Sequence, residues 1–427
     1  MATFHLRLST VLMRTIFVCI TLILCTGSRI AVAQTETILY SFCAQDVCAD
    51  GAWPDGDLIM DASGNLYGTA DAGVFQSGVV FELTPFGTET VILAFNNPDY
   101  GLLPSGGLVR DASGNFYGEA LEGGYFKKHI CKQDGCGLVY QLTPSWSETV
   151  IYNFTGSTAG GFPSGGLALD ADGNFYGATF GLGPKGHTSG SVFKVTPSGV
   201  ETLLHKFGAS KSDGFINVPQ RLVVDQGGNI YGTTDFGGVK GRLGKNGNCG
   251  RGCGTIFEIN ASGVETILHT FKGYTQGDGA HPMAGLILDG KGNLYGTTNY
   301  GGLYGYGTIF QLTPTGEETI LYNFTGGTDG AFPESHLTMD SQGNLYGTTW
   351  RGGTYSFGTV YKLTPAGVES VLHSFSGGAD GGWPQEAGLV LDAQGNIFGT
   401  TPLGGSANGI CSQGGQLGCG VLFKLTP

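Results

Sequence analysis

The chain repeats one short phrase seven times, and this repetition constrains the fold more than any other feature. The phrase reads D-x-x-G-N, then an aliphatic or aromatic residue, then Tyr or Phe, then Gly. Successive copies lie 50 to 64 residues apart, and their asparagines are Asn65, Asn115, Asn174, Asn229, Asn293, Asn344 and Asn396. A period of this size is typical of a tandem-repeat fold in which each unit packs on its neighbours.

One copy of the repeat reads as four short strands. Apolar runs at 285–289 and 294–298 flank a turn in which Gly and Asn tolerate positive φ angles. A third run, 307–314, alternates apolar and polar residues and ends at Pro314, which cannot continue a paired strand. A fourth run spans 318–324. The unit therefore predicts an antiparallel four-stranded sheet with tight turns after its first and third strands.

The order of strands along the chain predicts how the array ends. The first strand-like segment, 36–42, matches the fourth strand of the repeat, whereas the last one, 420–427, matches the third. Each end therefore supplies what the other lacks, as closure of a ring requires. We predict an all-β fold, a seven-bladed β-propeller over residues 34–427, whose last blade combines 388–427 with the N-terminal strand. Closure removes two sheet edges that would otherwise invite aggregation.

Residues that recur in every copy are assigned to the scaffold. The Gly-Asn pair builds the turn between the first two strands, and the aromatic residue that follows is expected to face the blade interfaces. The recurrent Asp could suggest calcium sites, but a calcium loop concentrates several carboxylates in one segment. We therefore expect this Asp to accept hydrogen bonds from the following turn, and we predict no metal site and no cofactor.

The first 33 residues have the features of a secretory signal peptide. Arg7 and Arg14 supply positive charge, an apolar run spans 15–24, and small residues precede a cleavage point near Ala33. This apolar run is too short to cross a bilayer, so we expect no membrane insertion and a secreted or periplasmic protein. The net charge of −13, which becomes more negative without the arginines of the leader, argues against nucleic acid as a partner.

Eight of the ten cysteines lie outside the leader, in the close pairs Cys43/Cys48, Cys131/Cys136, Cys249/Cys253 and Cys411/Cys419. In an exported protein such pairs favour disulfides. Zinc ligation is the alternative, because similar spacings can hold a metal. We favour disulfides because each pair lies in its own repeat and no histidine stands at finger-like spacing from any of them.

The loops of one face carry the variation between repeats. In an up-and-down blade the turns after the first and third strands share one face, and the remaining loops share the other. All the long insertions and all the cysteine pairs fall in the loops of that second face. Binding residues usually lie on variable loops held by a rigid frame, so we predict that this loop face binds the partner.

Several side chains of the loop face are candidates for binding. Aromatic or histidine side chains precede a recurrent proline at Trp53, Phe162, His281, Phe332 and Trp383. They could stack on sugars, or they could pack beneath the loops. Residues that depart from the repeat pattern complete the candidate binding set, and these are Arg221, Trp350 and Arg351. Glu119 is a further departure, because it replaces a threonine of the second strand.

Polar residues that differ between blades follow the same prolines, near the expected mouth of the central channel. Asp57, Glu334, His336 and Glu386 are the candidate catalytic residues among them. Paired carboxylates with a histidine could support the acid–base chemistry of a lyase or a hydrolase. The sequence contains no nucleophile elbow, phosphate loop, H-E-x-x-H or dinucleotide-binding fingerprint.

The repeat unit, with its D-x-x-G-N-L-Y-G-T-T, G-T-V-F-K-L-T-P and E-T-V-L-Y-S-F segments, resembles the GloVer tandem repeat of exported bacterial proteins. The match is close at 296–298, 307–314 and 318–324, and it covers residues 36–427. The resemblance implies a propeller-like array and brings no established activity. Many members of that family carry a C-terminal surface anchor, and since none is found here we expect a released or periplasmic protein.

The D-x-x-G-N-L phrase is also similar, more weakly, to the repeats of streptogramin-lyase-type propellers. Those enzymes use a catalytic histidine on the channel face. His281 and His336 are the counterparts that this resemblance implies, although the flanking motif differs.

These observations lead to three hypotheses about function. The first is a monomeric secreted propeller that binds a glycan or another extracellular polymer through its loop face. The second is a polysaccharide lyase or hydrolase acting at the channel mouth, and the third is a structural envelope protein. A tight cluster of Asp57, Glu334, His336 and Glu386 would favour the enzyme, whereas exposed aromatic side chains at the loop face would favour binding.

Overall fold

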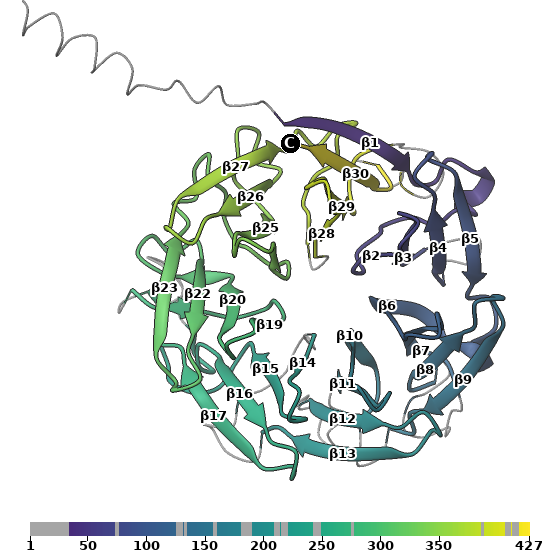
Figure 1. Ribbon diagram of the computed structural model, residues 1–427, viewed down its shortest axis with the longest axis horizontal. Helices are drawn as coiled ribbons and strands as arrows, with labels where there is room; N and C mark the ends of the chain where they lie inside the picture. The colour runs from purple at the N-terminus through teal and green to yellow at the C-terminus, as the bar shows by residue number, and fades with distance from the viewer. Residues whose placement is uncertain are drawn as a thin grey trace, which may run out of the picture.

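The protein is a ring of seven four-stranded antiparallel sheets (Figure 1). The computed structural model describes residues 34–427 apart from 73–76, 125–130, 132–134, 157–159, 181–189, 209–213, 215–220, 242–248, 275–276, 386–387, 406–410 and 412–417. The predicted leader, residues 1–33, thus lies outside the described residues. In each blade the first strand lies innermost and the fourth lies on the outer rim (Figure 1).

Blades 1 to 3 follow the order of the chain. Blade 1 contains β2 (Ile59–Met60), β3 (Leu66–Ala70), β4 (Val79–Leu83) and β5 (Glu89–Ala94). Blade 2 contains β6 (Leu102–Arg110), β7 (Phe116–Glu122), β8 (Leu138–Leu142) and β9 (Glu148–Asn153). Blade 3 contains β10 (Pro163–Leu169), β11 (Phe175–Thr179), β12 (Ser191–Val195) and β13 (Glu201–Lys206).

Blades 4 to 6 repeat the pattern. Blade 4 contains β14 (Val223–Val224), β15 (Ile230–Thr234), β16 (Thr255–Ile259) and β17 (Glu265–Thr270). Blade 5 contains β19 (Ile287–Leu288), β20 (Leu294–Thr298), β22 (Thr308–Leu312) and β23 (Glu318–Asn323), and its loops add the short pair β18 (Gly279–Ala280) and β21 (Tyr300–Gly301). Blade 6 contains β24 (Thr338–Met339), β25 (Leu345–Thr349), β26 (Thr359–Leu363) and β27 (Glu369–Ser374).

Blade 7 closes the ring, as the sequence predicts. It contains β28 (Val390–Leu391), β29 (Ile397–Thr401), β30 (Val421–Thr426) and the N-terminal strand β1 (Thr35–Ser41). Strand β1 pairs antiparallel with β30, from Thr35 opposite Thr426 to Ser41 opposite Val421 (Figure 1). The two 3₁₀ turns of the described chain, η1 (Asp46–Cys48) and η2 (Pro98–Tyr100), lie in loops between blades.

The recurrent Asp holds the turn after the first strand, as expected. In blade 5, Oδ1 of Asp289 accepts the backbone N–H groups of Lys291 and Asn293, each at 2.8 Å. Its other oxygen, Oδ2, accepts the Asn293 amide at 2.8 Å and the Tyr295 hydroxyl at 3.2 Å. The same carboxylate therefore satisfies the turn and fixes the aromatic residue of the second strand.

The recurrent aromatic residue packs at the blade interface, which confirms its predicted position. Tyr67 of blade 1 lies 4.6 Å from Phe116 of blade 2, measured between ring centroids. Both belong to a buried cluster that spans the two blades. The glycine after the aromatic residue is required by close packing, since a Cβ atom on Gly296 would lie 2.7 Å from the Phe310 ring.

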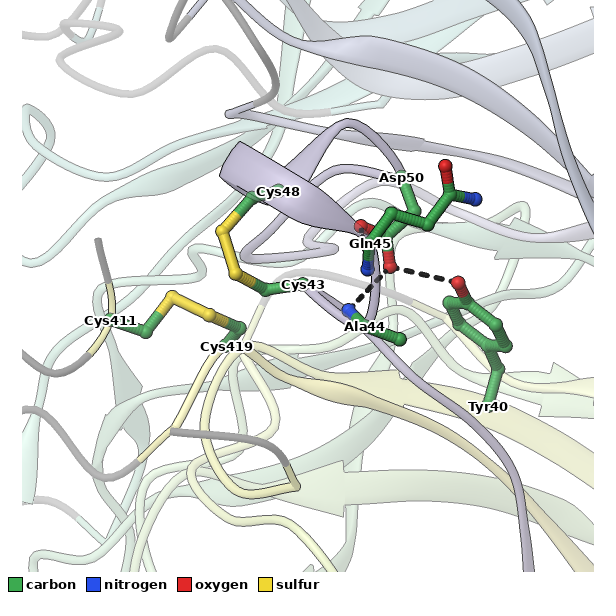
Figure 2. The surroundings of a disulfide bond; sticks show 8 residues. All are labelled: Tyr40, Cys43, Ala44, Gln45, Cys48, Asp50, Cys411 and Cys419. Atoms are coloured by element: carbon green, nitrogen blue, oxygen red, sulfur yellow. Dashed lines mark hydrogen bonds between the residues drawn. A yellow bond between two sulfur atoms is a disulfide. The ribbon is translucent and has the colours of Figure 1, made fainter. Parts of the chain in front are cut away.

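All four predicted disulfides form: Cys43–Cys48, Cys131–Cys136, Cys249–Cys253 and Cys411–Cys419. Each pair lies in its own repeat of the sequence, but two of the four disulfides lie close together in space. Cys43–Cys48 follows β1 and Cys411–Cys419 precedes β30, and Figure 2 shows the two bonds side by side in the closing blade. Ring closure brings the two ends of the chain together. Because these ends are far apart in the sequence, the sequence alone does not show that the two disulfides are neighbours.

Disulfides persist in oxidising compartments, so four of them support an extracellular or periplasmic protein. Within the residues that the structure describes, no helix has the length and apolar character needed to span a bilayer.

Candidate functional site at the channel mouth and loop face

Asp57, Arg221 and His336 occupy the same place in three different blades. Each is followed by a leucine that directly precedes the inner strand, and these leucines are Leu58, Leu222 and Leu337. The other four blades carry glycine at this place, and these residues are Gly107, Gly166, Gly285 and Gly388. Equivalent positions of the seven blades lie at the same level around the central axis. The three charged or polar side chains can therefore meet at the channel mouth.

These three side chains form one hydrogen-bonded cluster. A guanidinium nitrogen of Arg221 lies 2.8 Å from Oδ2 of Asp57, and Nε2 of His336 lies 3.2 Å from the same oxygen. The second carboxylate oxygen, Oδ1, accepts the backbone N–H of Gly388 at 2.6 Å. Asp57 thus links blade 1 to blades 4, 6 and 7 across the centre of the ring.

The Asp57 carboxylate is held in its ionised form. Its side chain is almost fully buried, and this burial alone would raise its pKa. The facing His336 and Arg221 side chains and the Gly388 N–H outweigh burial, so the pKa of Asp57 lies well below its ordinary value. The cluster therefore contains a carboxylate at neutral pH, not a carboxylic acid that could serve as a general acid.

His336 has no free nitrogen for catalysis. Its Nδ1 accepts the backbone N–H of Gly285 at 3.0 Å, so this nitrogen carries a lone pair. The ring hydrogen is thereby assigned to Nε2, which faces Asp57. Both nitrogens are engaged by the protein itself, whereas a general base must reach a proton on the substrate.

A central cavity of about 670 Å³ lies along the inner strands. Leucine, isoleucine and valine side chains of these strands line most of its wall, and Asp57, Arg221 and His336 contribute polar groups. The Arg221 side chain remains 40% exposed, so its other N–H groups can reach a bound molecule.

The remaining catalytic candidates are placed differently. Glu334 lies two residues before the ring position of His336, and its Oε1 accepts the Asn299 side-chain amide at 2.6 Å. Glu386 lies outside the described residues. The structure therefore brings Asp57 and His336 together, and it adds Arg221, which the sequence analysis assigned to binding.

The aromatic residues before the recurrent prolines pack beneath the loops. All five take positive φ angles between 52° and 58°, and these residues are Trp53, Phe162, His281, Phe332 and Trp383. None of them is exposed. His281 lies between the rings of Phe236 and Tyr300, and burial lowers its pKa to about 4. Two roles were considered for these side chains, stacking on sugars and packing beneath the loops. Their positions agree with packing beneath the loops.

Trp350 and Arg351 join this aromatic layer in blades 5 to 7. The Arg351 guanidinium lies over the rings of Trp350 and Trp383, at 4.2 and 5.4 Å from their centroids. Trp383 in turn stacks on Phe357. Cation–π contacts of this kind hold the arginine over the rings, so Arg351 is a fixed, exposed charge on the loop face.

Three exposed tyrosines lie in the loops beside this layer. Tyr304 and Tyr306 follow β21 in blade 5, and Tyr355 follows β25 in blade 6, with exposed fractions of 51%, 39% and 58%. Tyr304 and Tyr355 hold equivalent places in two loops of the same length. We call these three residues together with Arg351 the tyrosine rim. Sequence reasoning missed the tyrosines, although alignment of the two loops would have shown the shared position.

Glu119 departs from the repeat for a structural purpose. It is fully buried, and its Oε2 accepts the backbone N–H of Gly166 in the next blade at 3.1 Å. Burial raises the pKa of Glu119 to about 8. The carboxyl group therefore links blades 2 and 3 away from solvent.

The family model described as the Gloeobacter/Verrucomicrobia repeat matches residues 129–340 and 244–411, which together span most of the chain. The chain belongs to this family. The family accounts for the repeat and agrees with the GloVer resemblance of the sequence. A comparison with curated proteins found no match.

Solved structures of other propellers are similar to this chain in fold. A streptogramin B lyase has a TM-score of 0.54 at 12% identity, covering 92% of this chain and 97% of its own. Virginiamycin B lyase from Staphylococcus aureus has a TM-score of 0.54 at 13% identity, covering 92% and 99%. The extracellular domain of BT4673, a putative hybrid two-component system from B. thetaiotaomicron, has a TM-score of 0.54 at 12% identity, covering 91% and 39%. At these identities the likeness shows the fold alone.

Proposed function

We propose that this family member is a binding module that recognises an extracellular glycan or a similar polymer through its loop face. The observation that carries the proposal is the tyrosine rim, in which three exposed rings lie in the loops of blades 5 and 6 and the loop of blade 6 also carries an arginine fixed on two tryptophans. Aromatic rings offer a flat apolar face with a polar tip, which suits the stacked and hydrogen-bonded contacts of sugars. Arg351 adds a fixed cation that would favour polymers with carboxylate groups.

The channel mouth supports binding more than catalysis. The two nitrogens of His336 are engaged by Gly285 and Asp57. Asp57 accepts three donors and is shielded from solvent. For this reason we do not propose the lyase or hydrolase. Arg221, partly exposed at the mouth, could hold an anionic group of the same polymer.

The test is retention of the purified chain on a panel of plant and microbial polysaccharides, with release of reducing or unsaturated ends followed in the same samples. The variant is Tyr304→Ala with Tyr355→Ala. Truncation of an exposed aromatic anchor typically costs about 1–2 kcal/mol, so we expect at least about a tenfold loss of affinity.

Phe86 offers a matched control. It is 95% exposed in the turn between β4 and β5, on the face opposite the loops. Phe86→Ala should bind the polymer as the unmodified chain does. Equal retention of the tyrosine variant and the unmodified chain would contradict the proposal, and release of polymer ends would point to the enzyme instead.

A further inference from the structure

The outer rim of the ring carries a repeated group of side chains at the blade interfaces. Six outer strands begin with Glu, and β1 carries Glu36 as its second residue. The fifth residue counted from this Glu is His in three blades, Tyr in three blades and Leu in one. In five blades an Asp-Gly pair follows in the next loop. In two of these blades, Asp278 and Asp380, each with a histidine at the fifth position, lie close to the Glu of the neighbouring blade.

Two of these groups contain histidine and are fully described. One consists of His269, Asp278 and Glu318, from blades 4 and 5. The other consists of His373, Asp380 and Glu36, from blades 6 and 7. In each, the imidazole nitrogen and one oxygen of each carboxylate all lie within 4.8 Å of one another. We call these two groups the rim triads.

The distances within the rim triads differ from those of hydrogen bonds. Nε2 of His269 lies 3.6 Å from both Asp278 and Glu318. Nε2 of His373 lies 3.4 Å from Glu36 and 3.5 Å from Asp380. Both nitrogens are shielded from solvent and have no hydrogen-bond partner among the described residues. Around a tetrahedral ion with bonds near 2.0–2.1 Å, the ligand atoms are separated by about 3.3–3.4 Å.

The tyrosine version of the same group closes into hydrogen bonds. Tyr322 donates to Asp329 at 3.1 Å, and Tyr40 donates to Asp50 at 2.8 Å (Figure 2). In both versions the ring packs edge-on against the phenylalanine two residues later, as in Tyr322 on Phe324 and His269 on Phe271. The scaffold is thus the same, and only the histidine version leaves its donor atoms apart.

We propose that each rim triad binds one divalent transition-metal ion, of which Zn²⁺ is the probe, through one imidazole nitrogen and two carboxylate oxygens. Imidazole with carboxylate ligands suits zinc and its neighbours, whereas calcium takes six to eight oxygens. Three protein ligands leave the fourth position of a tetrahedral ion to water. Each ion bridges two blades, since the Glu comes from the neighbouring sheet.

The charge of the triads agrees with a bound cation. In each rim triad two carboxylates lie beside one imidazole, Asp278 with Glu318 and Asp380 with Glu36. Two carboxylates that repel each other in a half-buried place are relieved by a positive ion between them. Asp278 and Asp380 are meanwhile fixed by backbone N–H groups, from Lys272 and Ser376 at 2.8 Å, so these carboxylates are preorganised.

The experiment counts bound metal in the full, oxidised chain. The protein is stripped with EDTA, dialysed against Zn²⁺, freed of excess metal and analysed for zinc per chain. The variants His269→Tyr and His373→Tyr each install the residue found at this place in three other blades. The variant Tyr322→His builds the histidine version beside Asp329 and Glu369.

We expect each of the two His→Tyr variants to lose one bound ion per chain and Tyr322→His to gain one. Replacement of Zn²⁺ by Ca²⁺ should leave the triads without metal. Circular dichroism checks that the variants keep the fold, and a thiol assay checks that the cysteines stay oxidised. A zinc content that is the same in the unmodified chain and in both His→Tyr variants would overturn the proposal, because the metal would then be bound elsewhere.

Discussion

At the scale of single residues, the channel mouth shows how one repeat position can serve two purposes. Glycine occupies this position in four blades and leaves room for the strand ends to approach the axis. Asp57, Arg221 and His336 occupy it in the other three and bind one another. The cluster connects sheets that are not neighbours in the ring, so it adds a constraint that no single blade interface supplies.

Replacement of Asp57 by Asn tests this constraint. The change removes the charge that accepts hydrogen bonds from Arg221 and His336 and leaves both donors facing an amide. Charge-assisted hydrogen bonds contribute about 1.5–3 kcal/mol, so we expect a loss of about that size in the free energy of unfolding. Urea denaturation measures it. The polymer affinity should stay within about twofold of the unmodified chain, and a selective loss of binding with unchanged stability would contradict a structural role.

The strands show which parts of the fold can be predicted from sequence. The third and fourth strands of the repeat were predicted at 307–314 and 318–324, and β22 and β23 lie within these ranges. The inner strand was predicted at 285–289, but β19 covers only two residues. The inner strand pairs with β20 at only two residues and lines the central cavity, so its apolar run extends beyond the residues that are paired.

The candidate sites were less predictable than the strands. The proline motif placed Asp57 and His336 near the channel mouth, but it could not show that Glu334 turns toward Asn299. The rim triads escaped notice because the glutamate comes from a different blade than the histidine and the aspartate. Which residues of two repeats come into contact depends on how the blades pack in the ring. The spacing of residues within one repeat cannot predict such contacts.

The outer strands predict an unusual dependence of stability on pH. Burial raises the pKa of several glutamates at the start of the outer strands to about 7 from the ordinary 4.5, and these include Glu36, Glu89, Glu148 and Glu369. Between pH 4.5 and about pH 7, these glutamates are protonated more fully in the folded chain than in the unfolded chain. Stability is therefore fully present below the unfolded pKa and is lost as the pH rises through about 7.

We expect the metal-free chain to melt at a higher temperature near pH 5 than near pH 8. Differential scanning calorimetry across this range measures the change. Glu148→Gln should flatten the profile, because burial alone raises the pKa of Glu148 and the amide cannot ionise as the pH rises. Glu317→Gln is the control, since Glu317 is exposed in the turn before β23. A melting temperature that rises steadily from pH 5 to pH 8 would refute the expected sign.

At the scale of the whole molecule, the closing blade is where the ring depends on a single strand. Strand β1 covers the edge of β30, and Phe42 directly after it is fully buried in the core between blades 7 and 1. The two neighbouring disulfides, Cys43–Cys48 and Cys411–Cys419, fasten the loops at the same place (Figure 2). In the other blades a tight turn joins the third and fourth strands, so this blade alone is held by non-covalent pairing of β1 with β30.

Deletion of residues 34–42 should therefore open the ring. The edge of β30 would lose its partner, and an uncovered edge strand pairs readily with other chains. We expect the shortened chain to aggregate, as seen by size-exclusion chromatography, and to lose its cooperative melting transition. A permuted chain that carries 36–42 after Pro427, joined by the three residues found at 315–317, should recover both properties because the turn of blade 7 then matches that of blade 5. A shortened chain that stays monomeric with the original melting temperature would show that β1 is dispensable for closure.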